Sequence, residues 1–241
     1  MKKLVLSVLM SFCALTMFAQ ISEEGFFRLC ATGAIGDVRI AAAAGANINA
    51  WGEIKDADGF TSYYTCLMIA CKNENVDVVE FLLDHGARPN PHSREYPIHY
   101  VLNWQRSDLQ TIMRIIRKLH AKGAEIDART TMGQSPLLMA AVDPQKEDIG
   151  LLLIELGADV NVRDVDANTP LLTVLASGMA NTMQHRLIEK LVSSGANTNA
   201  KNKLGENAYS ILQKYDKRKS SEVNYYSWYW KIMDNYYNGN V

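Results

Sequence analysis

Apolar residues recur at helical spacing at four places along the chain, each shortly before a Gly-Ala pair. The four sets are Val78, Val79, Leu82 and Leu83; Ile115, Ile116 and Leu119; Ile149, Leu153 and Ile154; and Leu187, Ile188, Leu191 and Val192. Residues three and four apart share one face of an α-helix, whereas every second residue shares a face of a strand. Each set therefore predicts an amphipathic helix with one buried face.

The Gly-Ala pairs belong to a motif that the chain contains five times. Its copies read "AGANINAWG", "HGARPNPHS", "KGAEIDART", "LGADVNVRD" and "SGANTNAKN". Glycine readily adopts the left-handed conformation that commonly ends a helix, and the Asn or Asp that follows favours a turn. We expect this structural role at Gly45, Gly86, Gly123, Gly157 and Gly195.

A second motif starts another helix after most of these turns. It reads "SPLLMA" from Ser135 and "TPLLTV" from Thr169, with related copies "TCLMIA", "YPIHYV" and "NAYSIL". A hydroxyl or amide side chain caps the first backbone N–H groups of a helix, and proline tolerates the first helical position. Pro97, Pro136 and Pro170 are expected there. The repeating unit is therefore turn, helix, short turn, helix.

Two such motifs recurring in register resemble the ankyrin-repeat family, whose unit of about 33 residues opens on TPLHxA. The resemblance implies an all-α ankyrin solenoid of about six helix-turn-helix units, with short β-turn or hairpin fingers. The approximate units are 24–56, 57–91, 92–129, 130–163, 164–201 and 202–241. The first and last resemble terminal caps, and Trp228, Tyr229 and Trp230 would seal the last hydrophobic face.

Departures from the family pattern identify the loops that carry specificity, because loops of a solenoid vary at little cost to the stacked core. The segment "WGEIKDADGFTSYY" lengthens the first finger, and "NWQRSDLQT" and "SGMANTMQH" lengthen two inter-helix loops. Arg88, Pro89 and Pro91 replace the usual turn residues after Gly86.

The first residues, "MKKLVLSVLMSFCALTMFAQ", have two lysines, a short apolar run and a small residue at Ala19. This order predicts a cleavable signal peptide at 1–19 and an ankyrin domain at 20–241, in a periplasmic or secreted protein of bacterial type. The alternatives are a retained signal anchor, a buried first helix, or lipid attachment at Cys13.

Composition excludes several classes of function. The 241 residues are 48% hydrophobic and carry a net charge of −1. Such a balance provides no electrostatic surface for nucleic acid, and no segment after the leader is suited to stable membrane insertion. A monomer that binds another protein is expected.

Candidate chemistry is sparse. The sequence has no GxSxG, HExxH, GxGxxG or phosphate-loop motif, so we expect no catalytic residue, metal or cofactor, with an enzyme of unrecognised type as the remote alternative. His99 falls on the histidine of the family motif, which implies a structural role. Cys30, Cys66 and Cys71 match no zinc or redox motif; they are interpreted as small core residues, with one disulfide between adjacent repeats as the alternative.

The resemblance implies that partners bind at the finger tips and at the exposed ends of the first helices. The helix positions are Lys72, Asn73, Asn103, Trp104, Val142 and Asp143, with Ala176 and Ser177. The finger positions are Thr131, Met132, Gln134, Val165, Asp166 and Asn168, with Lys203, Leu204 and Glu206.

Aromatic residues of the altered loops add Trp51, Tyr63 and Tyr64 to these candidate sites. Exposed tryptophans are typical of binding hot spots, but Trp104 could instead fold under its inserted loop, and the three finger aromatics pose the same choice.

The predicted function is therefore non-catalytic protein binding in the periplasm or cell envelope. The alternative is an inhibitor or immunity-type protein that neutralises a specific toxin or enzyme. A protector of an envelope enzyme and an assembly scaffold also fit this sequence.

Overall fold

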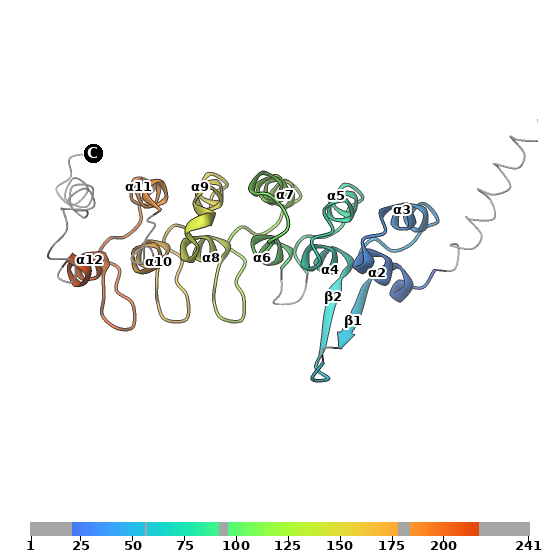
Figure 1. The fold of residues 1–241 in the computed structure, drawn as a ribbon, viewed down its shortest axis with the longest axis horizontal. Coiled ribbons are helices and arrows are strands. Elements are labelled where there is room, and N and C mark those ends of the chain that lie inside the picture. The colour runs from blue at the N-terminus through green and yellow to red at the C-terminus, as the bar shows by residue number, and fades with distance from the viewer. Residues whose placement is uncertain (1–20, 56, 92–95, 178–183, 217–241) are drawn as a thin grey trace, which may run out of the picture. The chain divides into compact units, whose positions relative to one another are not determined.

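The computed structural model describes residues 21–55, 57–91, 96–177 and 184–216. The predicted leader 1–19 and the aromatic segment around Trp228 lie outside the described residues, as does the loop at 178–183. The chain divides into two compact units, residues 1–125 and 126–241. Figure 1 shows the helices and the one hairpin of the described residues.

The first unit contains three helix pairs. They are α2 (Glu23–Thr32) with α3 (Ile35–Ala43), α4 (Cys66–Lys72) with α5 (Val76–Asp84), and α6 (Pro97–Leu102) with α7 (Leu109–Ala121). The first helices of the pairs form one row, in which α4 packs between α2 and α6. The second helices form another row, in which α5 packs between α3 and α7. The apolar faces predicted from the sequence are buried between these rows.

The second unit repeats this arrangement. Its elements are α8 (Pro136–Val142), a 3₁₀ turn η1 (Pro144–Lys146), α9 (Glu147–Glu155), α10 (Pro170–Ser177), α11 (His185–Ser193) and α12 (Ala208–Asp216). Helix α10 packs between α8 and α12, and α11 packs on α9. The described residues of the whole chain thus contain five helix pairs and α12. The predicted sixth unit extends beyond them.

The helices begin and end where the two motifs place the signals. The Oγ1 of Thr65 accepts a hydrogen bond from Met68 N at 3.2 Å, and the Oγ of Ser135 accepts one from Leu138 N at 3.3 Å. Helix α9 ends at the left-handed Gly157, whose φ is 93°. Ala158 N reaches back to Leu153 O at 3.0 Å, the backbone pattern that satisfies the last carbonyls of a helix.

Asparagine side chains fasten successive turns together. The amide of Asn49 donates to Gly86 O at 3.3 Å and accepts from Arg88 N at 2.8 Å. Asn90 makes the same pair of bonds to Gly123 O and Glu125 N. Because both ends of each amide are used, the turns of neighbouring repeats hold one another in register. In the second unit Asn161 makes the equivalent pair of bonds, donating to Gly195 O and accepting from Asn197 N.

The lengthened first finger is a two-stranded antiparallel hairpin, β1 (Trp51–Lys55) and β2 (Thr61–Thr65). Trp51 pairs with Thr65, and Gly52 pairs with Tyr64. Gly52 lies so close to α2 that an added Cβ would be 2.3 Å from Phe27 Cδ1. Glycine here allows the hairpin to rest against α2. Within the described residues the remaining fingers are turns without strands, so the hairpin form of the predicted fingers occurs once.

The three cysteines described are buried and free of disulfide bonds. Cys30 of α2 and Cys66 of α4 come together, and their hydrogen bond, followed by burial, raises the pKa of the Cys66 thiol. Burial alone raises the pKa of Cys71. The three thiols are therefore small core residues, and the alternative of a disulfide between adjacent repeats does not occur among them. His99 is buried as well, with its ring edge-on to Tyr96 at 5.8 Å.

Candidate protein-binding site

Two aromatic rings stand on the outward face of the hairpin. Side chains of a strand alternate between its faces, so the paired Gly52 and Tyr64 share one face, with Gly52 beside Phe27 of α2 and Tyr64 beside Tyr100 of α6. Trp51 and Tyr63 lie on the opposite face. Trp51 and Tyr63 are each 57% exposed, and their ring centroids lie 5.7 Å apart. This separation is typical of interacting aromatic pairs. The hairpin therefore presents a preformed aromatic surface.

Tyr64 differs from the adjacent Tyr63 because its ring is packed against other residues of the fold. Its side chain is 5% exposed, and its ring meets Tyr100 edge-on at 6.1 Å. Lys72 Nζ donates to its hydroxyl at 2.5 Å and lies 4.3 Å from the ring centroid. The prediction that Tyr64 faces a partner freely is therefore corrected: the ring supports the site from within, and Lys72 occupies the solvent side.

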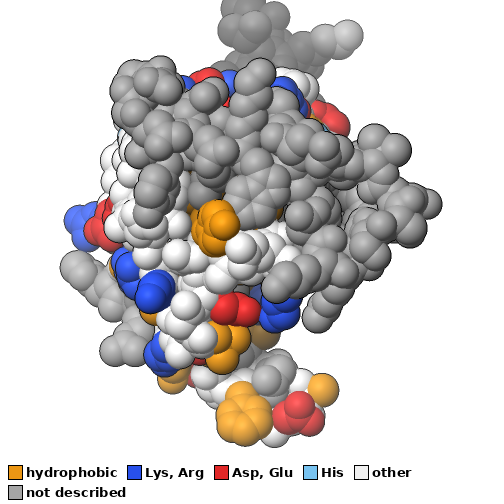
Figure 2. Space-filling view, turned by 90° about the vertical axis from the view of Figure 1, so that its left-hand side faces the viewer, with side chains coloured by type: hydrophobic (Ala, Val, Ile, Leu, Met, Phe, Trp, Pro, Cys, Tyr) orange, Lys and Arg blue, Asp and Glu red, His pale blue; other side chains and the backbone are white. Residues whose placement is uncertain are grey.

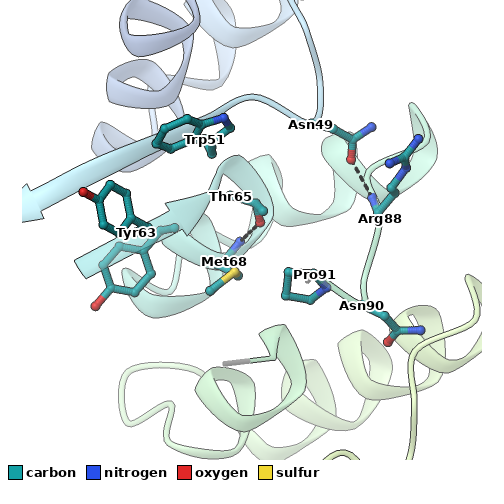
Figure 3. Close-up of a pocket in the computed structure, with 9 residues that line it drawn as sticks. Asn49, Trp51, Tyr63, Thr65, Met68, Arg88, Asn90 and Pro91 are labelled. Atoms are coloured by element: carbon teal, nitrogen blue, oxygen red, sulfur yellow. Dashed lines mark hydrogen bonds between the residues drawn. The ribbon is translucent and has the colours of Figure 1, made fainter. Parts of the chain in front are cut away.

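A pocket of about 280 Å³ opens beside these rings (Figure 3). Trp51, Tyr63 and Tyr64 line it from the hairpin, Met68 of α4 contributes apolar surface, and Pro91 lines it from the next turn. All of these residues belong to the first unit. The pocket exists because the hairpin carries its aromatic rings over the start of α4.

The polar lining residues are Asn49, Thr65, Arg88 and Asn90. Three of them are engaged in the fold, since the two asparagines fasten the turns and Thr65 caps α4. Among the described residues, the guanidinium of Arg88 has no hydrogen-bond or ion-pair partner, and none of those that line the pocket is a carboxylate.

Sequence reasoning did not assign Asn49, Met68, Arg88, Asn90 or Pro91 to a site. It did single out Arg88 and Pro91 as unusual turn residues, which was the one available signal.

Trp104 is a core residue, and its prediction as a partner contact is wrong. The indole is 4% exposed, and its Nε1 donates to Cys71 O at 2.6 Å. Backbone N–H groups of Gln105 and Arg106 donate to the carboxylate of Glu74 at 2.8 and 2.9 Å, which holds the inserted segment against the turn between α4 and α5. Trp104 thus folds under its inserted loop, which was the alternative that the sequence offered.

The other predicted helix positions of the first unit are mixed. Lys72 and Asn103 are exposed. Asn73 is half-buried, and its amide donates to Ala31 O at 2.8 Å, which links two repeats. The amide of Asn73 is therefore used in the fold.

In the second unit most predicted positions reach solvent. The exposed ones are Thr131, Met132, Gln134, Val142, Val165 and Asp166. Asp143 and Asn168 are half-buried and act locally: Asp143 caps η1 through Gln145 N at 3.0 Å, and Asn168 bonds Asp164. Met132, Val165 and Leu204 place exposed apolar side chains on three successive turns. Figure 2 shows hydrophobic side chains at the lower end of the face that it presents.

The described residues include acidic and other potential metal-ligating side chains. No group of three metal-ligating side chains occurs among them. Glu147 and Asp148, an adjacent acidic pair, are both engaged by Arg186 of α11, at 2.9 and 2.6 Å. This ion pair joins two repeats. None of the described helices is long and apolar enough to cross a bilayer.

Rows of paired helices with projecting turns define a class of repeat proteins that present side chains for binding. Residues 67–164 match the ankyrin-repeat family, in three copies. The chain therefore contains ankyrin repeats, and proteins built from them are protein–protein interaction modules.

Individual proteins are similar over parts of their length. Ankyrin repeat and SOCS box protein 6 of Pongo abelii is 32% identical over 138 residues, which are 55% of this chain and 31% of that protein. A putative ankyrin repeat-containing protein of Treponema pallidum is 28% identical over 66% of this chain and 50% of its own length. An ankyrin repeat domain of Acinetobacter baumannii AYE has a TM-score of 0.66 at 22% identity, over 82% of this chain and 94% of that domain. This chain spans about a third of the first relative, and the last likeness concerns the fold alone.

Proposed function

We propose that this protein binds another protein through the outward face of the β1–β2 hairpin and the adjoining pocket, and performs no chemistry of its own. The observation that carries the proposal is the exposed pair Trp51 and Tyr63 beside a preformed apolar pocket. Large aromatic side chains are costly to leave in water unless a partner covers them, and they dominate binding hot spots.

The fold supports this use of the hairpin. Gly52 fixes β1 against Phe27, and Tyr64 is buried, so the two exposed rings stand on a rigid base. A rigid surface loses little conformational entropy when a partner docks. The general role of ankyrin repeats in protein interaction agrees with this proposal.

We further propose that binding takes place outside the cytoplasm, in the periplasm or envelope. The support is the order of Lys2 and Lys3, the apolar run and Ala19 in the sequence. Within that compartment the partner could be a toxin or enzyme that the protein neutralises, which is the narrower form of the same proposal.

Affinity capture tests the binding site. Immobilised wild-type protein, the double variant Trp51→Ala with Tyr63→Ala, and the control Ile40→Ala are each exposed to an envelope extract of the source organism. Ile40 is an exposed apolar residue on α3, away from the hairpin.

We expect one stoichiometric protein to be retained by the wild type and by the control, and lost from the double variant. Retention by all three would refute the placement of the site. Retention of no protein, together with turnover of a small substrate by the purified chain, would instead favour an enzyme.

A further inference from the structure

The pocket beside the hairpin has a chemistry that narrows the choice of partner. Its volume of about 280 Å³ is at the lower limit of pockets that enclose whole small-molecule ligands, roughly 300 Å³ and above. A pocket of this size suits one part of a larger ligand. Trp51, Tyr63, Met68 and Pro91 give it apolar walls, so that part is a large apolar side chain.

Its charge is one-sided. Arg88 is the charged residue among the described lining residues, and it lies beside Asn49 on the side of the pocket away from Trp51 and Tyr63, with its side chain extending away from the rings (Figure 3). Lys72 adds a second positive charge beside Tyr64 and has no carboxylate within ion-pair distance among the described residues. The hairpin carboxylate of Glu53 is exposed and does not line the pocket.

The polar side chains around Arg88 are unable to neutralise it. The Oδ1 of Asn49 accepts a hydrogen bond from the backbone N–H of Arg88 itself, and its Nδ2 donates one to Gly86 O. Asn90 is held at both ends of its amide by Gly123 and Glu125. A guanidinium whose neighbours are fully engaged binds a carboxylate in preference to other groups, because its planar donors match the two carboxylate oxygens.

We propose that the partner contributes a linear segment in which a large apolar side chain enters this pocket while a neighbouring Asp or Glu side chain pairs with Arg88. The inference rests on the protein-binding function proposed above and specifies the chemistry of the segment that is bound. The apolar side chain would be covered by Trp51 and Tyr63, and that cover would shield the ion pair from water.

A library of random linear peptides displayed on phage tests this chemistry. The peptides are fused at their carboxyl ends, so that any carboxylate that binds must come from a side chain. We expect selection on the wild-type protein to enrich a large apolar residue next to Asp or Glu. A consensus that has no acidic position overturns the inference.

A synthetic, carboxyl-amidated peptide of the selected sequence then allows the contact to be measured by calorimetry. We expect Arg88→Glu to weaken its binding at least about tenfold, which corresponds to about 1.4 kcal/mol. Trp51→Ala should weaken it about thirtyfold, as is typical of a hot-spot aromatic. Circular dichroism confirms that each variant is folded.

The control is Arg39→Glu, which makes the same change of charge at an exposed position on α3. It should leave the affinity within about twofold of wild type, since Arg39 does not line the pocket and belongs to α3, which is separate from the hairpin in Figure 1. A peptide whose acid is replaced by Lys should bind Arg88→Glu better than wild type. Equal weakening by the Arg39 and Arg88 variants, or no preference of the Lys peptide, overturns the pairing.

Failure of this inference is distinguishable from failure of the proposed function. If the captured native partner depends on Trp51 and Tyr63 but binds Arg88→Glu as tightly as wild type, protein binding stands and the acidic segment is wrong. If neither a peptide nor a native protein is retained, both proposals fail.

Discussion

The two tryptophans of the first unit should respond in opposite ways to the same substitution. Trp104→Ala removes an indole that is 4% exposed, whereas Trp51→Ala removes one that is 57% exposed. Truncation of a buried tryptophan costs about 3 to 5 kcal/mol, because the transfer free energy is lost and a cavity remains. For the exposed Trp51 we expect a clearly smaller loss, because more than half of its area stays in water in the folded state.

The hydrogen bond of Trp104 is a smaller part of this cost. Its Nε1 donates to Cys71 O at 2.6 Å, but that carbonyl also accepts from Glu74 N at 3.2 Å. Loss of the indole donor therefore leaves the carbonyl with a partner. Trp104→Phe, which keeps most of the volume, should cost about 1 to 2 kcal/mol, the net value of one hydrogen bond and minor repacking.

Urea denaturation followed by circular dichroism measures these differences. Repeat proteins can unfold in parts, so the three variants and the wild type are compared at the first transition and with the slope free to vary. A Trp104→Ala protein within about 1 kcal/mol of wild type would refute the core placement of Trp104. A Trp51→Ala loss of about 3 kcal/mol would show that the hairpin ring is part of the fold.

Three further predictions concern the helix end, the thiols and the leader. Gly157→Val should lower the free energy of unfolding by about 1 to 3 kcal/mol, because φ is 93° at this position. Gly36→Ala in α3 is the control: an added Cβ would meet open space there, so the change should be neutral or stabilising by about 0.5 to 1 kcal/mol. An unchanged urea midpoint for Gly157→Val would contradict the helix-end assignment. Because the pKa values of Cys66 and Cys71 are raised in the folded state, both thiols stay protonated while the unfolded chain ionises above the ordinary value of 9.0. The contribution of each thiol to the free energy of unfolding is then fully present below about pH 9 and falls as pH rises, by up to about 1.4 kcal/mol per pH unit. Urea titrations at about pH 8 and about pH 10 should therefore show a smaller loss of unfolding free energy for Cys71→Ala than for the wild type. Equal losses would contradict the burial argument. Finally, the intact mass of protein from fractionated cells should correspond to a chain that begins near Gln20 outside the cytoplasm, and a full-length cytosolic species would contradict export.

The repeat itself was predictable because its signals are local. A hydroxyl at Ser135 and a proline at the next position start a helix by satisfying or avoiding the same backbone N–H groups, whatever lies elsewhere in the chain. Gly157 ends one because of its own backbone freedom. The apolar spacing then assigns the buried face of each helix. These features act within one helical turn, and the sequence displays them directly.

The long finger was predictable as an insertion but not as a surface. Its extra length between Gly45 and Thr65 predicts a projection. Which aromatic ring faces outward depends on strand register, and a shift of one residue would exchange Tyr63 and Tyr64. The contact of Gly52 with Phe27 accompanies that register, and it joins residues of β1 and α2.

The sequence by itself determined the repeating helix pairs, their starts and ends, and the finger that departs from the pattern. Only the tertiary structure decided that Trp104 is buried against Cys71 of the preceding repeat and that Trp51 remains exposed. It alone placed Arg88 and the aromatic rings around the same pocket. The physical reason is that burial and pocket geometry depend on side chains from different repeats, about 33 residues apart in the chain, whereas helix signals depend on neighbours in sequence.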